Sequence, residues 1–336
     1  MSPRALTAWI LGAPGVILII GFLFQAIAAA NSSFFFTWGY YAEVLIAGLL
    51  QGVMYSLVAL GFVLIFKASG VFNFAQGSLV LFAALTMVGL MEMGLHWVLA
   101  LVATTAVLVL VALAVERVVL RPLVNQPQII LFMATIGIFY FLDGFGQTLW
   151  GSDVKVLDIG IPRDPIFILP GLVEGGILIN QFDLYAAATG GILVAVLAVF
   201  FQKTRIGRAL RAVADDHQAA LSVGIPLKVI WAVVWSVAGF VALIAGIMWG
   251  GKLGVQFTLA LIALKALPVL ILGGFTSIPG AIVGGLIIGA GEQVAEVFLG
   301  GFVGGAIQDW FAYMLAMLFL LFRPQGLFGE KIIERV

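Results

Sequence analysis

The stretch that decides the fold is residues 48–84, GLLQGVMYSLVALGFVLIFKASGVFNFAQGSLVLFAA. An apolar run stops at Lys67, passes a polar interruption that contains Asn73 and Gln76, and then resumes. Because a helix needs about 20 apolar residues to cross a bilayer, the first run is long enough to be a membrane span. Backbone groups left unpaired in hydrocarbon are costly, so we expect protein or water to cover the interruption.

The same apolar character extends along the whole chain, which has 336 residues, 63% of them hydrophobic and 10% charged. Continuous runs, rather than the short alternating segments of a membrane β-barrel, indicate helices. We predict an all-α polytopic membrane protein, a single transmembrane domain over 1–336 with about 8–10 membrane helices, some broken or re-entrant. The expected segments are about 8–30, 43–66, 74–94, 96–115, 129–150, 183–201, 229–250, 257–273, 280–299 and 304–322.

Basic residues predict the orientation, because Lys and Arg concentrate on the cytoplasmic side. If the N-terminus is cytoplasmic, one side receives Arg4, Lys67, Arg117, Arg121, Lys203, Arg205, Arg208, Arg211, Lys228, Arg323, Lys331 and Arg335. The other side receives only Lys155, Arg163 and Lys252. We therefore predict cytoplasmic N- and C-termini in a bacterial-type inner membrane, with 151–182 as an extracytoplasmic loop and 202–228 as a cytoplasmic one. Within the former, VKVLDIGI (154–161) alternates like a strand.

The composition also argues against several classes of function. The chain has no cysteine and only two histidines, so disulfides are excluded and we expect neither a metal centre nor another cofactor. Net charge is zero, which gives no general attraction to nucleic acid. There is no P-loop motif, and no serine–histidine or paired-aspartate arrangement indicates an enzyme. The first segment, 8–30, is longer than the apolar core of a signal peptide and is expected to be an ordinary span.

The loop 202–228 predicts a helix from about Thr204 to Val223 with Leu210, Val213, Ala214 and Leu221 near one face. The plain interpretation is an interfacial helix that binds lipid headgroups through its arginines. However, QAALSVG (218–224) resembles the EAA loop of ATP-binding-cassette importer permeases, with Gln218 in place of the glutamate. That resemblance implies a coupling helix that docks into a separate ATPase subunit. The implied coupling residues are Arg205, Arg208, Arg211, Asp215, Ala219, Ala220 and Gly224.

Five collinear blocks widen this resemblance to the LivH-type permeases of the branched-chain amino acid importers. They are 48–84, ATIGIFYFLDGFGQTLWG (134–151), TRIGRALRAVADDHQAALSVGI (204–225), LGGFTSIPGAIVGGLIIG (272–289) and FRPQGLFG (322–329). The family commonly has the motif N-F-A-H-G, and this chain has Gln76 at the position of the histidine. We therefore assign no essential chemistry to the family's histidine.

The resemblance implies a permease subunit that translocates branched-chain or related hydrophobic amino acids by alternating access. The implied partners are cytoplasmic ATP-binding subunits, a second permease subunit and an extracytoplasmic substrate-binding protein. Urea, short amides and aromatic acids stay open as substrates, and so does the choice between a homodimer and a heterodimer.

Two interrupted stretches share a pattern, SGVFNFAQ (69–76) and LGVQFTLA (253–260). Because the segments before them run in opposite directions, we expect an inverted repeat of about 43–115 against about 229–299. This places Asn73, Gln76, Gln256 and Thr258 on the translocation path. The alternative is that these four are loop residues at the membrane surface.

Four charged residues fall inside apolar segments, namely Asp143, Lys265, Glu292 and Glu296. Such residues are costly in a membrane and are usually functional. They raise the alternative of an ion-coupled secondary transporter that uses Glu292 and Glu296, against a structural pairing with Lys265 as one possible partner. Pro268 predicts a kink that frees backbone carbonyls. Gly280, Gly284, Gly285 and Gly289 predict close helix packing.

Overall fold

The computed structural model describes residues 38–123, 126–168, 176–215, 220 and 222–329, so the expected segment 8–30 lies outside the described residues. Its long helices are α2 (Trp38–Ser69), α4 (Trp97–Ala114), α5 (Gln128–Trp150), α6 (Gln181–Lys203), α9 (Leu227–Leu253) and α11 (Ile278–Val303). Its shorter ones are α3 (Gln76–Glu92), α7 (Arg205–Asp215), α10 (Ile262–Gly273) and α12 (Phe311–Phe322). A π-helical segment η1 (Val115–Leu120) and a 3₁₀ turn η2 (Arg121–Leu123) follow α4, and the 3₁₀ turns η3 (Phe257–Leu261) and η4 (Ile307–Asp309) precede α10 and α12.

The described helices confirm an all-α polytopic membrane protein. Six are long and apolar enough to cross a bilayer, and three further apolar helices, Gln76–Glu92, Phe257–Gly273 and Phe311–Phe322, are shorter. The expected segments 74–94 and 257–273, which begin within the interrupted stretches, are therefore the short helices α3 and η3–α10. The helices α4, α5 and α6 expose large apolar side chains such as Leu110, Tyr140 and Ile192, as helices in contact with lipid do.

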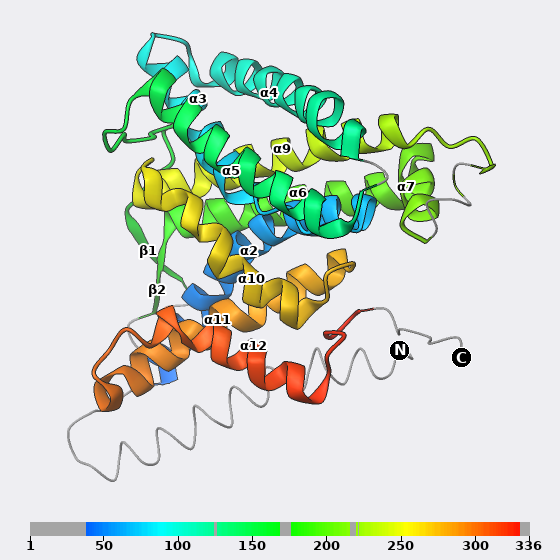
Figure 1. Cartoon of the computed structure of the whole chain (residues 1–336). Coiled ribbons are helices and arrows are strands. Elements are labelled where there is room, and N and C mark those ends of the chain that lie inside the picture. The colour runs from blue at the N-terminus through cyan, green and yellow to red at the C-terminus, as the bar shows by residue number, and fades with distance from the viewer. Residues whose placement is uncertain (1–37, 124–125, 169–175, 216–219, 221, 330–336) are drawn as a thin grey trace.

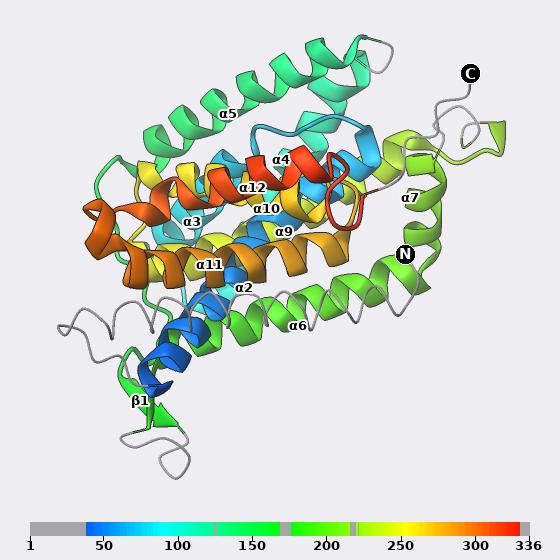
Figure 2. The ribbon, with the colours of Figure 1, turned by 90° about the horizontal axis from the view of Figure 1, so that it is seen from below.

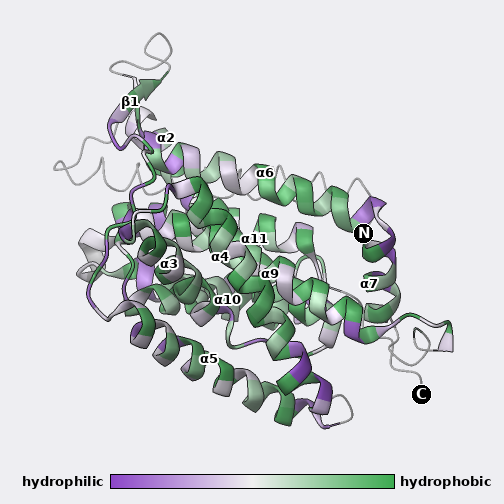
Figure 3. Ribbon diagram, turned by 90° about the horizontal axis from the view of Figure 1, so that it is seen from above, coloured by the Kyte–Doolittle hydropathy of each residue, from purple (hydrophilic) through white to green (hydrophobic). Residues whose placement is uncertain are grey.

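Polar structure gathers at the two ends of the helical bundle. The strands β1 (Pro165–Ile168) and β2 (Ile177–Asn180) form an antiparallel hairpin at one end, and α7 lies at the other (Figures 1 and 2). Hydrophilic residues concentrate towards these ends, and hydrophobic ribbon fills the space between them (Figure 3). We call the two ends the hairpin end and the α7 end.

Four of the basic residues predicted for the two sides lie at these two ends as expected, whereas Arg4, Lys331 and Arg335 lie outside the described residues. At the hairpin end, Lys155 pairs with Glu92, and Lys252 pairs with Asp183 at 2.8 Å. At the α7 end, Lys67 and Arg211 line one pocket. The charge asymmetry of the sequence therefore corresponds to a real separation along the bundle.

The strand predicted at 154–161 is wrong. Within it only Lys155 forms a bridge, to Val255, and the strands lie later in the loop. The alternation itself is real: Leu157 is buried, and Ile159 and Ile161 are half-buried against the core while their neighbours are exposed. In an extended segment with one side packed on the bundle, buried and exposed residues alternate in this way without any pairing in a sheet.

Glycines bring α11 into close contact with two neighbours. A Cβ added at Gly285 or Gly289 would collide with the backbone of α2 at Gly52 or Gly48, and one added at Gly280 or Gly284 would collide with α10. The prediction of close packing is confirmed, and α11 is the helix that joins α2 to α10.

The expected inverted repeat is present in the order and direction of the helices. The helix α2 runs from the hairpin end to the α7 end, and the shorter α3 returns from within the bundle, followed by α4. The helix α9 runs in the opposite direction, the shorter η3–α10 returns, and α11 follows. The starts of the two short helices meet, because a Cβ added at Gly77 would collide with the carbonyl oxygen of Ala260.

Candidate translocation and coupling sites

The interruption after α2 folds back into the protein. Gly70 has φ +69°, which a glycine adopts at little cost and which turns the chain at the end of α2. The Asn73 side chain accepts a hydrogen bond from the Ala75 N–H at 3.2 Å, and Thr135 Oγ1 of α5 accepts one from the Phe74 N–H at 3.0 Å. These bonds satisfy a backbone that has left the helix.

Asn73 and Gln76 are both fully buried. Gln76 lies against Gly61 of α2, where a Cβ would occupy the position of its amide. Neither side chain is therefore exposed on the surface of the chain, and their place on the translocation path stays a prediction. Among the described residues, Asn73 Nδ2 and both amide atoms of Gln76 have no hydrogen-bond partner. Buried polar atoms are almost always paired in proteins, so these three atoms mark an unusual place in the core.

The second interruption follows α9 at the hairpin end. Gly254 has φ +82°, and Val255 exchanges two backbone hydrogen bonds with Lys155, at 2.8 and 3.0 Å. Gln256 is half-buried and Thr258 is exposed. No hydrogen bond joins these two residues to Asn73 or Gln76 in the described structure. The two pairs predicted for the path thus lie on the two return segments and have no hydrogen bond between them among the described residues.

A small cavity lies between the two return segments. Phe62, Phe72, Phe74 and Phe139 line it together with Ala260, Leu261, Ala263, Leu264 and Leu267. Its volume of about 40 Å³ has room for a few water molecules but not for an amino acid. A substrate can therefore pass here only after the helices separate.

The helix α7, which the sequence predicts as a coupling helix, is held firmly against the end of α6. Thr204 caps it, because its Oγ1 accepts a hydrogen bond from the Gly207 N–H at 3.1 Å. Leu210 and Val213 are buried as predicted. Arg211 donates to the Phe201 carbonyl at 2.8 Å, so this arginine ties α7 to α6.

The outer face of this loop is cationic and open. Arg205 and Arg208 are exposed, whereas Ala220 is buried. Gly224, at φ +84°, ends the helical segment, and the Ile225 N–H bonds back to the Ala220 carbonyl at 3.0 Å, a common helix-ending turn. Ala219, Gln218 and the side chain of Asp215, including its expected pairing with Arg211, lie outside the described residues.

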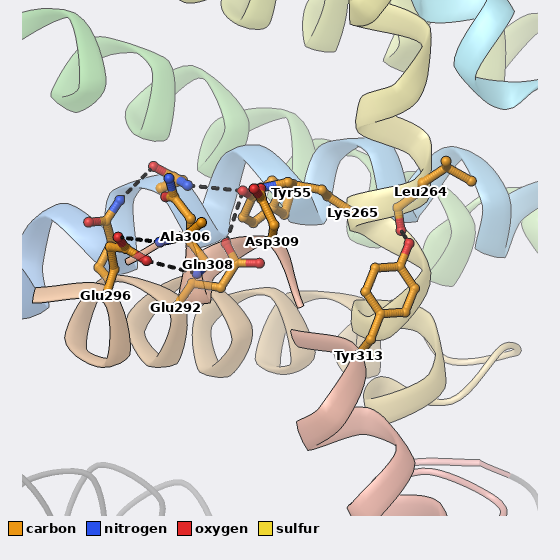
Figure 4. Close-up of polar contacts among 11 residues, drawn as sticks. Tyr55, Leu264, Lys265, Glu292, Glu296, Ala306, Gln308, Asp309 and Tyr313 are labelled. Atoms are coloured by element: carbon orange, nitrogen blue, oxygen red, sulfur yellow. Dashed lines mark hydrogen bonds and ion pairs between the residues drawn. The ribbon is translucent and has the colours of Figure 1, made fainter. Parts of the chain in front are cut away.

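Three of the four charged residues of the apolar segments, Lys265, Glu292 and Glu296, gather around α10 and α11 (Figure 4). Lys265 forms an ion pair with Asp309 of η4 at 3.0 Å, and not with Glu292 or Glu296. Glu296 accepts hydrogen bonds from the backbone N–H groups of Ala306 and Gln308, at 3.1 and 3.0 Å. It therefore holds the turn before α12 against α11.

Glu292 is buried between α2 and α11. Its Oε2 accepts a hydrogen bond from the Tyr55 hydroxyl at 3.0 Å. Gln51 donates to that hydroxyl at 2.9 Å, and Gln293 donates to Gln51 at 3.1 Å. The ring of Tyr55 stacks on Trp249 of α9, with centroids 5.2 Å apart. This network links three helices at their shared core. Asp143, the fourth residue, accepts a hydrogen bond from Gln147 at 3.1 Å within α5.

Pro268 has the effect predicted for it. A proline at this position cannot donate to the Leu264 carbonyl one turn earlier. That carbonyl accepts a hydrogen bond from the Tyr313 hydroxyl of α12 at 2.8 Å (Figure 4). The sequence indicated that a carbonyl would be free, but neither Tyr313 nor Asp309 could be identified as a partner, because both come from a segment about 45 residues further along the chain.

Comparison with known proteins identifies the family. Residues 44–323 match the family described as branched-chain amino acid transport system / permease component. The chain is 30% identical over 308 residues to the high-affinity branched-chain amino acid transport system permease protein BraD of Pseudomonas aeruginosa, covering 88% of this chain and 98% of the relative. It is 27% identical over 318 residues to the corresponding permease protein LivH of Escherichia coli, with the same coverage. A probable LivH of Methanocaldococcus jannaschii is 28% identical over 307 residues, covering 84% and 92%. Because the family match covers residues 44–323, this chain belongs to the family of permease components of branched-chain amino acid transport systems.

Proposed function

We propose that this chain is the membrane-spanning permease subunit of an ATP-binding-cassette importer for branched-chain or related hydrophobic amino acids. The match of residues 44–323 to the permease family is the observation that carries this proposal. The implied partners are cytoplasmic ATP-binding subunits, a second permease subunit and an extracytoplasmic binding protein that delivers the substrate. The α7 end then faces the cytoplasm, in agreement with its excess of basic residues.

In this proposal α7 is the coupling helix. Its buried face, with Leu210 and Val213, is fixed to the bundle, and its exposed face presents Arg205 and Arg208 to a partner. Arg211 bonds the end of α6, so a movement of α7 passes directly to that span. Asp215, Ala219, Ala220 and Gly224 complete the docking segment. Alternating access then follows from ATP-driven displacement of α7.

The translocation path is proposed to involve the two return segments. Asn73 and Gln76 lie at the start of α3, and Gln256 and Thr258 lie before α10. Where two short helices of opposite direction start inside a bundle, a separation of the repeats opens the space between them. The aromatic cavity beside Phe72 and Phe74 lies at this place.

The test is leucine uptake by membrane vesicles that contain the chain with its ATP-binding subunits and binding protein. We expect uptake that requires ATP and all partners and that continues in the presence of a protonophore. An ion-coupled transporter based on Glu292 and Glu296 would instead work alone and stop with the protonophore. That alternative has no support from the family, and Glu296 has a structural role as the cap of a turn.

The coupling role has a separate test in Arg208→Glu. This residue is exposed, and its side chain has a described contact of 3.4 Å to the Lys203 carbonyl, so the reversal does not disturb the core. We expect ATP hydrolysis to continue while leucine uptake is lost. Arg117→Glu, an exposed cation at the same end but on η1, is the matched control and retains uptake. Normal uptake with Arg208→Glu would contradict the docking role. Gly224→Asp is a less clean probe, because any side chain at φ +84° also strains the backbone.

A further inference from the structure

The ion pair of Lys265 and Asp309 joins α10, inside the bundle, to the η4 turn before α12. Close contacts of Gly273 with Gly280, and of Val269 with Gly284, set α10 antiparallel to α11. One further turn along this register places Lys265 beside the part of α11 that contains Gly285 and Gly289. Those two glycines pack on Gly48 and Gly52, near the midpoint of α2 (Trp38–Ser69). Lys265 therefore lies within the membrane bundle beside the middle part of α11, and Asp309 reaches it from the η4 turn before α12.

The pair is nevertheless open to the surface of the chain. The side chain of Asp309 is 68% exposed and that of Lys265 is 32% exposed. A charged group that faced hydrocarbon here would be expensive, so this surface faces water or another protein. In a permease, water reaches the inside of the bundle along the translocation path.

A purely structural role explains the pair poorly. An ion pair that is this exposed contributes little to stability, typically below about 1 kcal/mol. The attachment of α12 to α10 is already made by the Tyr313 hydroxyl on the Leu264 carbonyl. Two intramembrane charges at this position therefore need another reason.

The surroundings of the pair are apolar. Phe257, Leu261 and Leu264 are exposed on the same side of η3 and α10, between 37% and 49%. Leu261 and Leu264 also line the aromatic cavity. A cation and an anion 3.0 Å apart beside exposed aliphatic side chains match a zwitterion with an apolar side chain.

We propose that Lys265 and Asp309 bind the charged head of the amino acid during translocation, an inference that rests on the proposed function. Lys265 Nζ binds the α-carboxylate, and the Asp309 carboxylate binds the α-ammonium. Leu261 and Leu264 contact the apolar side chain. Before substrate arrives, the two residues neutralise one another. When the zwitterion separates them, each residue again has an opposite charge beside it, so neither state leaves an unpaired charge within the bundle.

Cysteine labelling tests whether water and substrate reach the surface beside Lys265, because the chain has no cysteine of its own. In vesicles that contain the complete transporter, Thr258→Cys and Leu261→Cys should react with a charged methanethiosulfonate, which attacks only thiols in water. Leucine delivered by the binding protein should slow this reaction. The control Leu321→Cys, on the exposed apolar side of α12, should not react. If neither Thr258→Cys nor Leu261→Cys reacts, or if leucine has no effect on them in a transporter that takes it up, the proposal is wrong.

Charge removal tests the two residues themselves. Lys265→Met and Asp309→Asn should each lower the leucine transport rate about ten- to a hundred-fold at saturating loaded binding protein, the usual loss for a charged hydrogen bond. Stimulation of ATP hydrolysis by the binding protein should persist, which a misfolded variant would not show. Lys252→Met, which breaks the other lysine–aspartate pair at the hairpin end, should transport normally. Unchanged transport with both Lys265→Met and Asp309→Asn would overturn the inference, whereas a wild-type complex without leucine uptake would overturn the proposed function beneath it.

Discussion

The substitution Gly289→Ala should destabilise the protein, because Gly289 lies where α11 touches α2. A Cβ at this position would be 2.5 Å from the N and Cα atoms of Gly52, whereas ordinary contacts begin near 3.4 Å. The two helices must therefore separate by about 1 Å. Since the obstacle is backbone, no side chain can rotate to relieve it.

The expected size of the effect follows from two opposing terms. Overpacking a core costs roughly 1–3 kcal/mol, and the upper part of that range applies to a collision with backbone. Alanine gains about 1 kcal/mol over glycine within a helix. The net loss should be about 1–2 kcal/mol in the free energy of unfolding. The same separation also lengthens the hydrogen bond from Tyr55 to Glu292, now 3.0 Å.

The assay is thermal stability of the detergent-purified protein, followed as the fraction that stays monodisperse after heating. The matched control is Gly191→Ala on α6, where a Cβ would have no atom within 4 Å. That variant should be more stable than wild type by about 0.5–1 kcal/mol, because only the helix propensity changes. The two alanine substitutions should thus change the free energy of unfolding in opposite directions. A Gly289→Ala protein as stable as Gly191→Ala would refute the close packing of α2 against α11.

Two further substitutions probe the return segments. Tyr313→Phe leaves the Leu264 carbonyl without its donor and should lower the free energy of unfolding by about 0.5–1.5 kcal/mol in the same heating assay. In a Pro268→Ala background the α10 backbone supplies the donor, so the loss should be smaller. A loss of the same size in that background would contradict this account. Gly61→Ala places a Cβ on the Gln76 amide, so it should displace the start of α3 and lower leucine uptake without abolishing membrane insertion. Normal uptake and stability in that variant would show that the position of Gln76 is not critical.

Much of the fold could be predicted because membrane helices depend on local composition. Each apolar segment expected within the described residues corresponds to a helix, and the two least regular ones are the short helices α3 and η3–α10. The antiparallel repeat was visible in the similar stretches 69–76 and 253–260. The buried face of α7 followed from helical spacing at Leu210 and Val213.

The failures have a common physical cause. The alternation in 154–161 was real, but alternation records which side of a segment is buried and not whether it has a strand partner. Lys265 was a candidate partner for Glu292 or Glu296, yet it bonds Asp309. Glu296 instead bonds two backbone N–H groups of a turn. Partner choice depends on how the chain folds back after α11, and no local pattern contains that information.

The sequence by itself determined a membrane protein of many helices, two interrupted stretches in opposite directions, and a basic loop. The membrane imposes these features, because it requires long apolar helices, interruptions whose backbone groups are covered, and basic residues concentrated on one side. Only the tertiary structure decided that Asn73 and Gln76 are buried, that Arg211 ties α7 to α6, and that Lys265 pairs with Asp309. These facts depend on contacts between segments distant in the chain, which arise when helices pack and not when they form.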